Sequence, residues 1–126
     1  MAYKVFIDGQ EGTTGLRIVE RFRNRTDVEL LTIDGELRKD TAERKRLINE
    51  SDYTFLCLPD AAATESVSLC ENKNTKIIDA STAHRINPAW AYGLPELSAQ
   101  HRDKIASSKR AAVPGCYASG FNAALY

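Results

Sequence analysis

Phe-Ile-Asp-Gly-Gln-Glu-Gly-Thr-Thr-Gly, residues 6–15, is the most informative stretch of this 126-residue sequence. The apolar run before it predicts a buried strand at residues 3–7. Residues 13–23 follow it with apolar side chains three positions apart, as on one face of a helix. Glycines between a strand and a helix let the backbone turn sharply and approach a pyrophosphate, which the first amides of the helix attract. The stretch predicts a dinucleotide-binding loop; the alternative is a tight turn with a helix-packing glycine.

The rest of the chain alternates between strand and helix patterns. Further strands are predicted at residues 28–33, 53–58, 76–79 and 110–113, with helices at 41–49, 61–71 and 97–107 and a short extended piece at 90–92. We expect Asp60 to cap the helix at 61–71. The alternation predicts an α/β fold, a Rossmann-type doubly wound and mostly parallel sheet, whose first four strands should follow the order 3-2-1-4.

Composition sets further bounds. The 17 basic and 17 acidic residues cancel, so nothing in the net charge favours DNA or an anionic membrane. No apolar run approaches the roughly 20 residues of a spanning helix, and the first residues lack the features of a secretory signal. Three cysteines make a poor disulfide framework. We therefore expect a cytoplasmic protein with no nucleic-acid partner, no membrane and no metal site.

The predicted cofactor contacts lie at the ends of the first three strands. The second strand should end beside the adenosine ribose, where an acidic residue favours NAD and a basic one NADP. Asp34 argues for NAD, whereas Arg38 and Lys39 argue for NADP or form a solvated loop, so the residues alone leave the choice open. The predicted cofactor-binding residues are Gly9, Gly12, Thr13, Thr14, Gly15, Thr32, Arg38 and Pro59.

Two later segments carry chemistry. Cys116 follows Pro114 and Gly115 at a predicted helix start, where the helix dipole lowers a thiol pKa; a buried cysteine in a turn is the alternative. Ser81 and Arg85 follow the fourth strand, at the sheet edge where ligands of open α/β sheets bind. Arg85 is either an anion clamp for substrate or a surface arginine. Cys57 and Cys70 are interpreted as small buried hydrophobes.

These segments together resemble the shorter class of N-acetyl-gamma-glutamyl-phosphate reductases. The matching stretches are residues 6–15, Cys-Leu-Pro-Asp at 57–60, residues 78–85, Tyr-Gly-Leu-Pro-Glu-Leu at 92–97, and Pro-Gly-Cys-Tyr at 114–117. The resemblance covers the whole chain. Val113 and Ala118 depart from it, since the family usually has Asn and often Pro at those positions.

The resemblance implies a reaction and a set of roles. The family reduces an acyl phosphate with NADPH to N-acetylglutamate semialdehyde, in arginine biosynthesis, through a thioester. Cys116 falls on its nucleophile, Arg85 and Ser81 on its substrate-binding segment, and the glycines on its pyrophosphate loop. Its histidine base lies in a second domain and matches neither His84 nor His101.

The resemblance also implies a domain organisation. We expect an NADP-binding domain at 1–115 and the start of a catalytic and dimerisation domain at 116–126, in a homo-oligomeric parent enzyme. By this interpretation the chain is a fragment that binds the cofactor and lacks turnover. A related semialdehyde or phosphate dehydrogenase and a non-catalytic dinucleotide-binding module are the alternatives.

Overall fold

The computed structural model describes residues 2–10 and 12–114. The sequence-predicted elements are present, each displaced by a few residues at most. In chain order they are β1 (Tyr3–Asp8), α1 (Thr13–Phe22), β2 (Val28–Leu31), α2 (Thr41–Glu50), β3 (Tyr53–Leu56), α3 (Asp60–Leu69), β4 (Lys76–Asp79), β5 (Ala91–Tyr92), the 3₁₀ turn η1 (Pro95–Leu97), α4 (Ala99–Ser107) and β6 (Arg110–Ala112).

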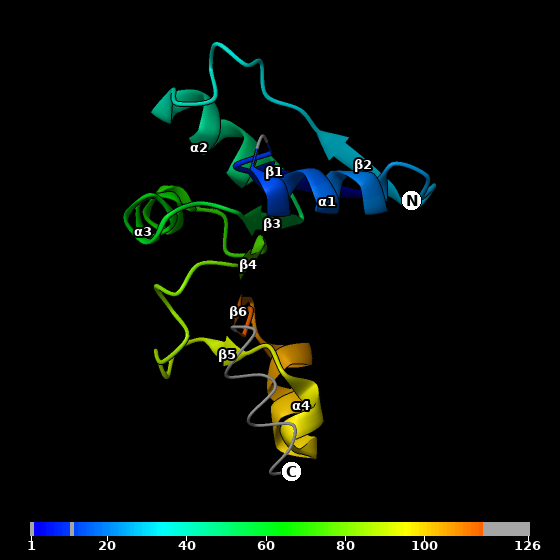
Figure 1. The fold of residues 1–126 in the computed structure, drawn as a ribbon, viewed down its shortest axis with the longest axis vertical. Coiled ribbons are helices and arrows are strands. Elements are labelled where there is room, and N and C mark those ends of the chain that lie inside the picture. The colour runs from blue at the N-terminus through cyan, green and yellow to red at the C-terminus, as the bar shows by residue number, and fades with distance from the viewer. Residues whose placement is uncertain (1, 11, 115–126) are drawn as a thin grey trace.

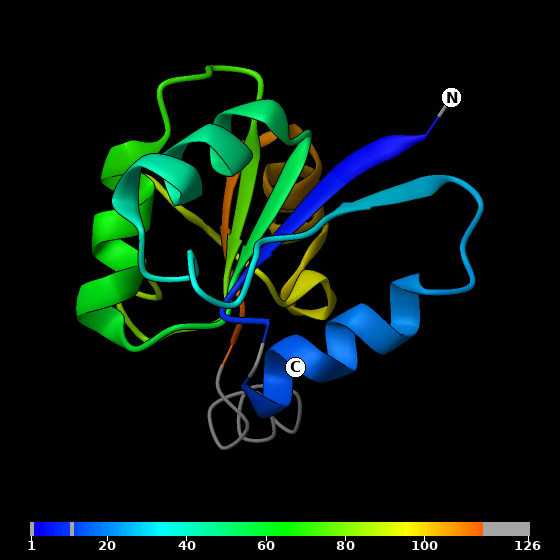
Figure 2. The same cartoon turned by 90° about the horizontal axis from the view of Figure 1, so that it is seen from above.

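The strands form one six-stranded sheet in the order β2-β1-β3-β4-β6-β5. Every pairing in it is parallel. Helices α2 and α3 cover one face, and α1 and α4 lie on the other (Figure 1; Figure 2). The Rossmann-type doubly wound class is therefore confirmed. Within the described residues, no helix is both long and apolar enough to cross a membrane.

The expected strand order 3-2-1-4 is wrong, because β1 lies between β2 and β3. The cause is the seating of α2. Its Leu47 and Ile48 pack against Phe6 of β1 in one buried cluster, so the helix crosses over β1. The chain then enters β3 on the far side of β1 from β2, and β2 is left at the sheet edge.

A buried ion pair fixes the same helix to the same strand. Both Nε and Nη2 of Arg44 donate to Oδ2 of Asp8, at 3.1 and 3.0 Å, and the Ser66 hydroxyl donates to that oxygen at 2.7 Å. Asp8 is the last residue of β1, and Ser66 belongs to α3. Removing one partner of such a pair leaves a buried charge uncompensated, which costs more than the pair itself contributes.

Burial alternates along the two central strands. Thr54, Leu56 and Ile77 are fully buried on the face that α2 and α3 cover. The intervening Tyr53, Phe55 and Ile78 are only half-buried, although Phe55 meets Phe22 of α1 at 5.6 Å between ring centroids. The hydrophobic core therefore sits mainly between the sheet and the α2–α3 layer.

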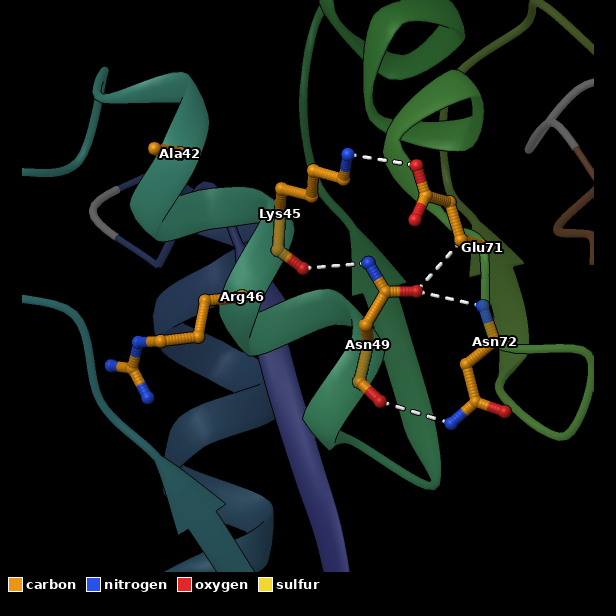
Figure 3. A pocket seen from close by; sticks show the side chains of 6 residues that line it. All are labelled: Ala42, Lys45, Arg46, Asn49, Glu71 and Asn72. Carbon is orange, nitrogen blue, oxygen red and sulfur yellow. Dashed lines mark hydrogen bonds and ion pairs between the residues drawn. The ribbon is translucent and has the colours of Figure 1, made fainter.

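Asn49 joins the end of α2 to the end of α3 (Figure 3). Its Nδ2 donates to the carbonyls of Lys45 and Leu69 at 2.8 and 2.9 Å. Its Oδ1 accepts from the amides of Glu71 and Asn72, both at 2.7 Å. One side chain thus hydrogen-bonds four backbone groups, including the Leu69 carbonyl at the end of α3, which has no intrahelical partner. The shallow surface hollow around Asn49 is built from these structural contacts.

We predict that Asn49→Ala lowers the free energy of unfolding by about 1–3 kcal/mol, because it strips partners from four backbone groups. Urea denaturation followed by circular dichroism measures the change. Lys45→Ala is the matched control. It removes an ion pair to Glu71 whose side chains are 44% and 71% exposed, and it should change stability by less than about 0.5 kcal/mol. Equal effects of the two variants would contradict this role of Asn49.

Candidate dinucleotide-binding site

The strand order places a crevice at the carboxyl ends of β1 and β3. β1 continues outward to β2, whereas β3 leads the other way to β4, so the direction of chain progression reverses between these two strands. In open α/β sheets, ligands bind at such a reversal, outside the carboxyl ends of the strands. Residues 9 and 10 leave β1 at this point, and residues 57–58 leave β3.

Three backbones converge on Gly9. Its φ is +92°, a conformation that L side chains rarely adopt. A Cβ built on Gly9 would lie 2.3 Å from the carbonyl oxygen of Cys57, and one on Gly15 would lie 2.2 Å from the carbonyl oxygen of Gly9. The end of β1, the end of β3 and the first turn of α1 therefore approach too closely for any side chain at either position.

Gly12 has a different role. It is the N-cap of α1 and provides no side chain to satisfy the first amides of that helix. The first-turn amides of a helix have no intrahelical acceptor, and together with the helix dipole they attract an anion. The loop thus brings a positive helix end to the crevice, as the sequence predicted.

A cavity of about 300 Å³ occupies the crevice. Its walls include the glycine loop after β1, the end of β3 and two cationic residues from the segment after β2. It is lined by Asp8, Gly9, Gln10, Gly12, Ile33, Arg38, Lys39, Cys57 and Leu58. A neighbouring hollow of about 230 Å³ shares Gly12, Cys57 and Leu58 and adds Thr13, Thr14 and Ala80. Predicted residues from the glycine loop and from the segment after β2 are therefore brought together, beside the unpredicted Cys57 and Leu58 at the end of β3.

Three predicted cofactor residues lie outside both sets of wall residues. Gly15 packs against the backbone of Gly9 within the first turn of α1. Thr32 is exposed beside Ile33, which faces the cavity instead. Pro59 is the N-cap of α3. Sequence reasoning missed Asp8, Gln10 and Ile33 as wall residues; their position at the ends of predicted strands was the signal that could have found them.

The structure separates the two opposing signals for cofactor choice. Oδ1 of Asp34 accepts from the amide of Glu36 at 3.2 Å, and the Asp34 carbonyl accepts from the amide of Leu37 at 2.8 Å. Asp34 therefore closes a turn and is not a wall residue of the cavity, whereas Arg38 and Lys39 are.

Cys57 differs from its sequence interpretation. It is only partly buried and lines both hollows. Its pKa is raised to about 11, first by burial and then by the charges of Asp8 and Asp79. A thiol with so high a pKa is almost entirely protonated at neutral pH, so Cys57 presents an unreactive, weakly polar surface to the cavity.

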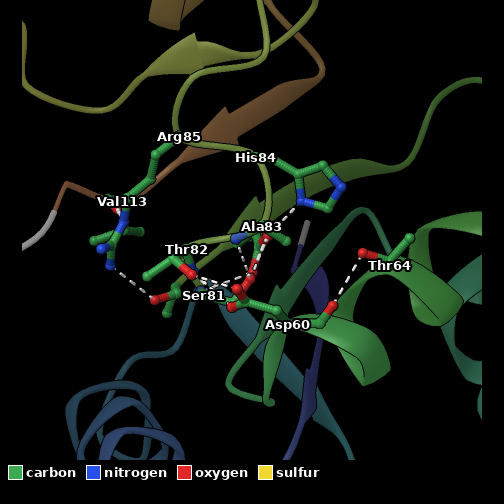
Figure 4. Close-up of polar contacts among 10 residues, drawn as sticks. Asp60, Thr64, Ser81, Thr82, Ala83, His84, Arg85 and Val113 are labelled. Atoms are coloured by element: carbon green, nitrogen blue, oxygen red, sulfur yellow. Dashed lines mark hydrogen bonds and ion pairs between the residues drawn. The ribbon is translucent and has the colours of Figure 1, made fainter.

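The segment after β4 is held by a buried carboxylate (Figure 4). Asp79 accepts from the amide and the hydroxyl of Ser81, both at 2.8 Å, and lies 2.5 Å from Nδ1 of His84. The His84 ring stacks on Trp90 at 4.1 Å between centroids. Ser81 and His84 are both buried. The Ser81 hydroxyl is thus engaged within its own loop, and its role toward substrate stays a prediction.

Asp60 binds this segment instead of capping its own helix. The N-cap of α3 is Pro59, and no side chain caps that end, so the expected cap was wrong. The Asp60 carboxylate accepts from the amide of Thr82 at 3.0 Å and from the Thr82 hydroxyl. These bonds lower the pKa of Asp60, the hydroxyl contributing most. The local sequence predicts Asp60 as the cap of α3, but in the structure its carboxylate binds the loop after β4.

Arg85 ties together the carboxyl ends of β4 and β6. Its Nε donates to the carbonyl of Val113 at 2.9 Å, and its Nη2 donates to the carbonyl of Ala80 at 3.3 Å (Figure 4). Arg85 is half-buried. It holds the chain immediately before the Pro114–Gly115–Cys116 segment. Cys116 itself lies outside the described residues, as does the expected boundary between residues 115 and 116.

A parallel sheet with a glycine-built, cation-lined cavity at its point of reversal defines a dinucleotide-binding domain of Rossmann type. The family model described as "Semialdehyde dehydrogenase, NAD binding domain" matches residues 34–106. The chain belongs to this family.

The sequence relatives of the chain identify a more specific family than the family model does. The chain is 52% identical over 120 residues to N-acetyl-gamma-glutamyl-phosphate reductase of a Chelativorans species, covering 95% of this chain and 39% of that protein. It is 51% identical over 118 residues to the same enzyme of Trichormus variabilis, covering 94% and 37%. The family resemblance found in the motifs is thereby confirmed. The chain spans well under half the length of these relatives.

Solved structures agree on the fold. Aspartate semialdehyde dehydrogenase II of Vibrio cholerae, complexed with ASA, superposes with a TM-score of 0.72 at 14% identity, covering 99% of this chain and 41% of that one. The Candida albicans aspartate semialdehyde dehydrogenase with NADP gives 0.71 at 14% identity, covering 99% and 46%. At such identities the likeness shows the fold alone.

We predict that Gly15→Ala destabilises the chain by about 1–3 kcal/mol, because the new methyl group meets backbone atoms that cannot turn aside. It does so despite the roughly 1 kcal/mol that alanine gains over glycine inside a helix. Gly12→Ala is the matched control. Its Cβ would meet nothing closer than 3.6 Å, and it should cost less than about 1 kcal/mol. Urea unfolding of both variants decides; a Gly15→Ala variant as stable as the parent would refute the close approach.

Proposed function

We propose that this chain is the NADP-binding part of an N-acetyl-gamma-glutamyl-phosphate reductase. Identities above 50% to that enzyme support the assignment. The observation that carries the choice of cofactor is the cavity wall, which includes Arg38 and Lys39, while Asp34 is engaged in a turn. Cationic side chains at the end of the second strand accommodate a 2′-phosphate, and a carboxylate there would repel it.

The residues present fit a dinucleotide. The close backbone approach at Gly9 and Gly15 brings the strand ends and the helix start together, and Gly12, which has no side chain, lines both hollows. The first turn of α1 would offer amides to a pyrophosphate. Arg38 and Lys39 would bind the 2′-phosphate, and Ile33 and Leu58 supply apolar wall. When bound, NADPH supplies a hydride.

The chemistry of the parent enzyme forms part of the proposal. The thiolate of Cys116 attacks the acyl-phosphate carbon, forming a thioester and releasing inorganic phosphate. The hydride of a bound NADPH would reduce the thioester carbon, which would release the Cys116 thiolate and give the semialdehyde. Arg85 and Ser81, which follow the carboxyl end of β4, would bind the substrate. A base from a further domain would accept and donate the protons. The domain limits 1–115 and 116–126, a homo-oligomeric parent and a cytoplasmic location remain predictions.

We expect calorimetric titration to show tighter binding of NADP than of NAD. Arg38→Ala should weaken NADP binding by about 10- to 100-fold, the worth of one charge-assisted hydrogen bond, and change NAD binding by less than about threefold. Arg46→Ala is the matched control, since Arg46 is exposed on α2 and pairs with Glu43 and Glu50. An unchanged preference in Arg38→Ala would remove this residue from the site.

A second prediction concerns thiol reactivity. With limiting iodoacetamide near neutral pH, Cys116 should be labelled before Cys57 and Cys70. At a pKa of about 11, only about one Cys57 molecule in 10⁴ is thiolate at pH 7, whereas Cys116 follows Pro-Gly at a predicted helix start. Peptide mapping by mass spectrometry gives the order. Earlier labelling of Cys57 or Cys70 would remove the physical support for Cys116 as nucleophile.

A further inference from the structure

The wall of the dinucleotide cavity contains a carboxylate. Asp8 is a wall residue, and only 5% of its side chain is exposed. The ligand proposed for this cavity carries negative phosphates, and an ionised carboxylate beside them opposes binding through a partly desolvated medium. The negative charge of Asp8 is felt at the cavity wall, because it contributes to the raised pKa of the Cys57 thiol.

Arg44 compensates this carboxylate from behind the cavity. Two of its nitrogens donate to Asp8 Oδ2, and its side chain is only 8% exposed. Nη1 lies 3.5 Å from Oε1 of Glu65, whose side chain is half exposed. Arg44 is not among the wall residues of the cavity, so its effect on a ligand passes through Asp8.

The same pair anchors the segment that carries the cavity's cations. Arg38 and Lys39 directly precede Asp40, whose side chain caps α2 by accepting from the amide of Glu43 at 3.1 Å. Arg44 lies in the next turn of this helix and joins it to the end of β1. The position of the two cations relative to the glycine loop therefore depends on the Asp8–Arg44 contact.

We propose that Arg44 is a positioning residue for cofactor selectivity, which offsets part of the charge of Asp8 at the cavity wall and fixes the Arg38–Lys39 segment so that the cavity prefers a dinucleotide with a 2′-phosphate. The inference rests on the proposed NADP-binding function and extends it to a pair that no ligand needs to touch. It differs from a purely structural role because it predicts a change in selectivity that follows the charge of Asp8.

Three variants separate charge from packing: Arg44→Gln, Asp8→Asn and the double substitution. Arg44→Gln leaves Asp8 uncompensated, and NADP affinity should fall roughly tenfold more than NAD affinity, the order expected for one unit charge near a partly solvated phosphate. Asp8→Asn removes the carboxylate charge and should raise the NADP-to-NAD affinity ratio. The double substitution should return the ratio to within about threefold of the parent. Affinities are measured by calorimetric titration of the 126-residue chain.

Arg25→Gln is the matched control. Arg25 also pairs with an aspartate, Asp27, but in the exposed connection just before β2, at the amino ends of the strands, and the ratio should not change. Thermal unfolding establishes that each variant is folded. If Arg44→Gln does not fold, Asp8→Asn and the double substitution still test the inference, since they predict a raised and a restored ratio respectively.

The pH dependence of Cys57 alkylation gives a readout that needs no dinucleotide. The Cys57 pKa should rise in Arg44→Gln and fall in Asp8→Asn, following the net charge at the wall. Shifted Cys57 reactivity with an unchanged NADP-to-NAD ratio overturns the inference and leaves the proposed function standing. A parent chain that binds neither dinucleotide removes the proposed function, and this inference with it.

Discussion

The close approach of three backbones at Gly9 is the constraint on which the remaining architecture depends. The end of β1 turns through a positive φ there, against the carbonyl of Cys57 on one side and beneath the first turn of α1 on the other. If the residue had a side chain, β1 and β3 could not end side by side with a helix starting between them. The cavity exists because these chain segments meet without side chains, and it inherits its polarity from the helix start.

The elements and the fold class could be predicted because they follow from local patterns. Alternating apolar runs, loop glycines and amphipathic helices all act over a few residues. The strand order could not, because it depends on where α2 lies. Its sequence suggests a solvated, charged helix, yet Arg44 is buried against Asp8, which is 36 positions away in sequence. No local pattern distinguishes a buried arginine of this kind from its exposed neighbours on the same helix.

In the candidate site, too, some features could be predicted from local sequence and others could not. The loop glycines and Arg38 could be placed at the cavity from their positions after predicted strands, whereas the hydrogen-bond partners of the acidic side chains could not be predicted. Asp34 bonds its own turn, and Asp60 bonds Thr82 instead of capping α3. Hydrogen-bonding capacity can be read from a sequence, but its allocation depends on which donors the fold brings near, and here those donors lie between two and 22 positions away.

The all-parallel sheet divides the molecule into two ends with different freedom to change. Every strand has its carboxyl end on the side of the cavity. There the backbones of Gly9 and Cys57 lie in close contact, and the Arg85 side chain binds the backbone carbonyl of Val113. The return connections at the other end include the exposed residues 23–26, and the Arg25 side chain there forms a surface ion pair with Asp27. Insertions, tags and sequence drift are best accommodated in connections of that kind. The cavity and the connections that tolerate variation thus lie at opposite ends of the strands, separated by the length of a strand.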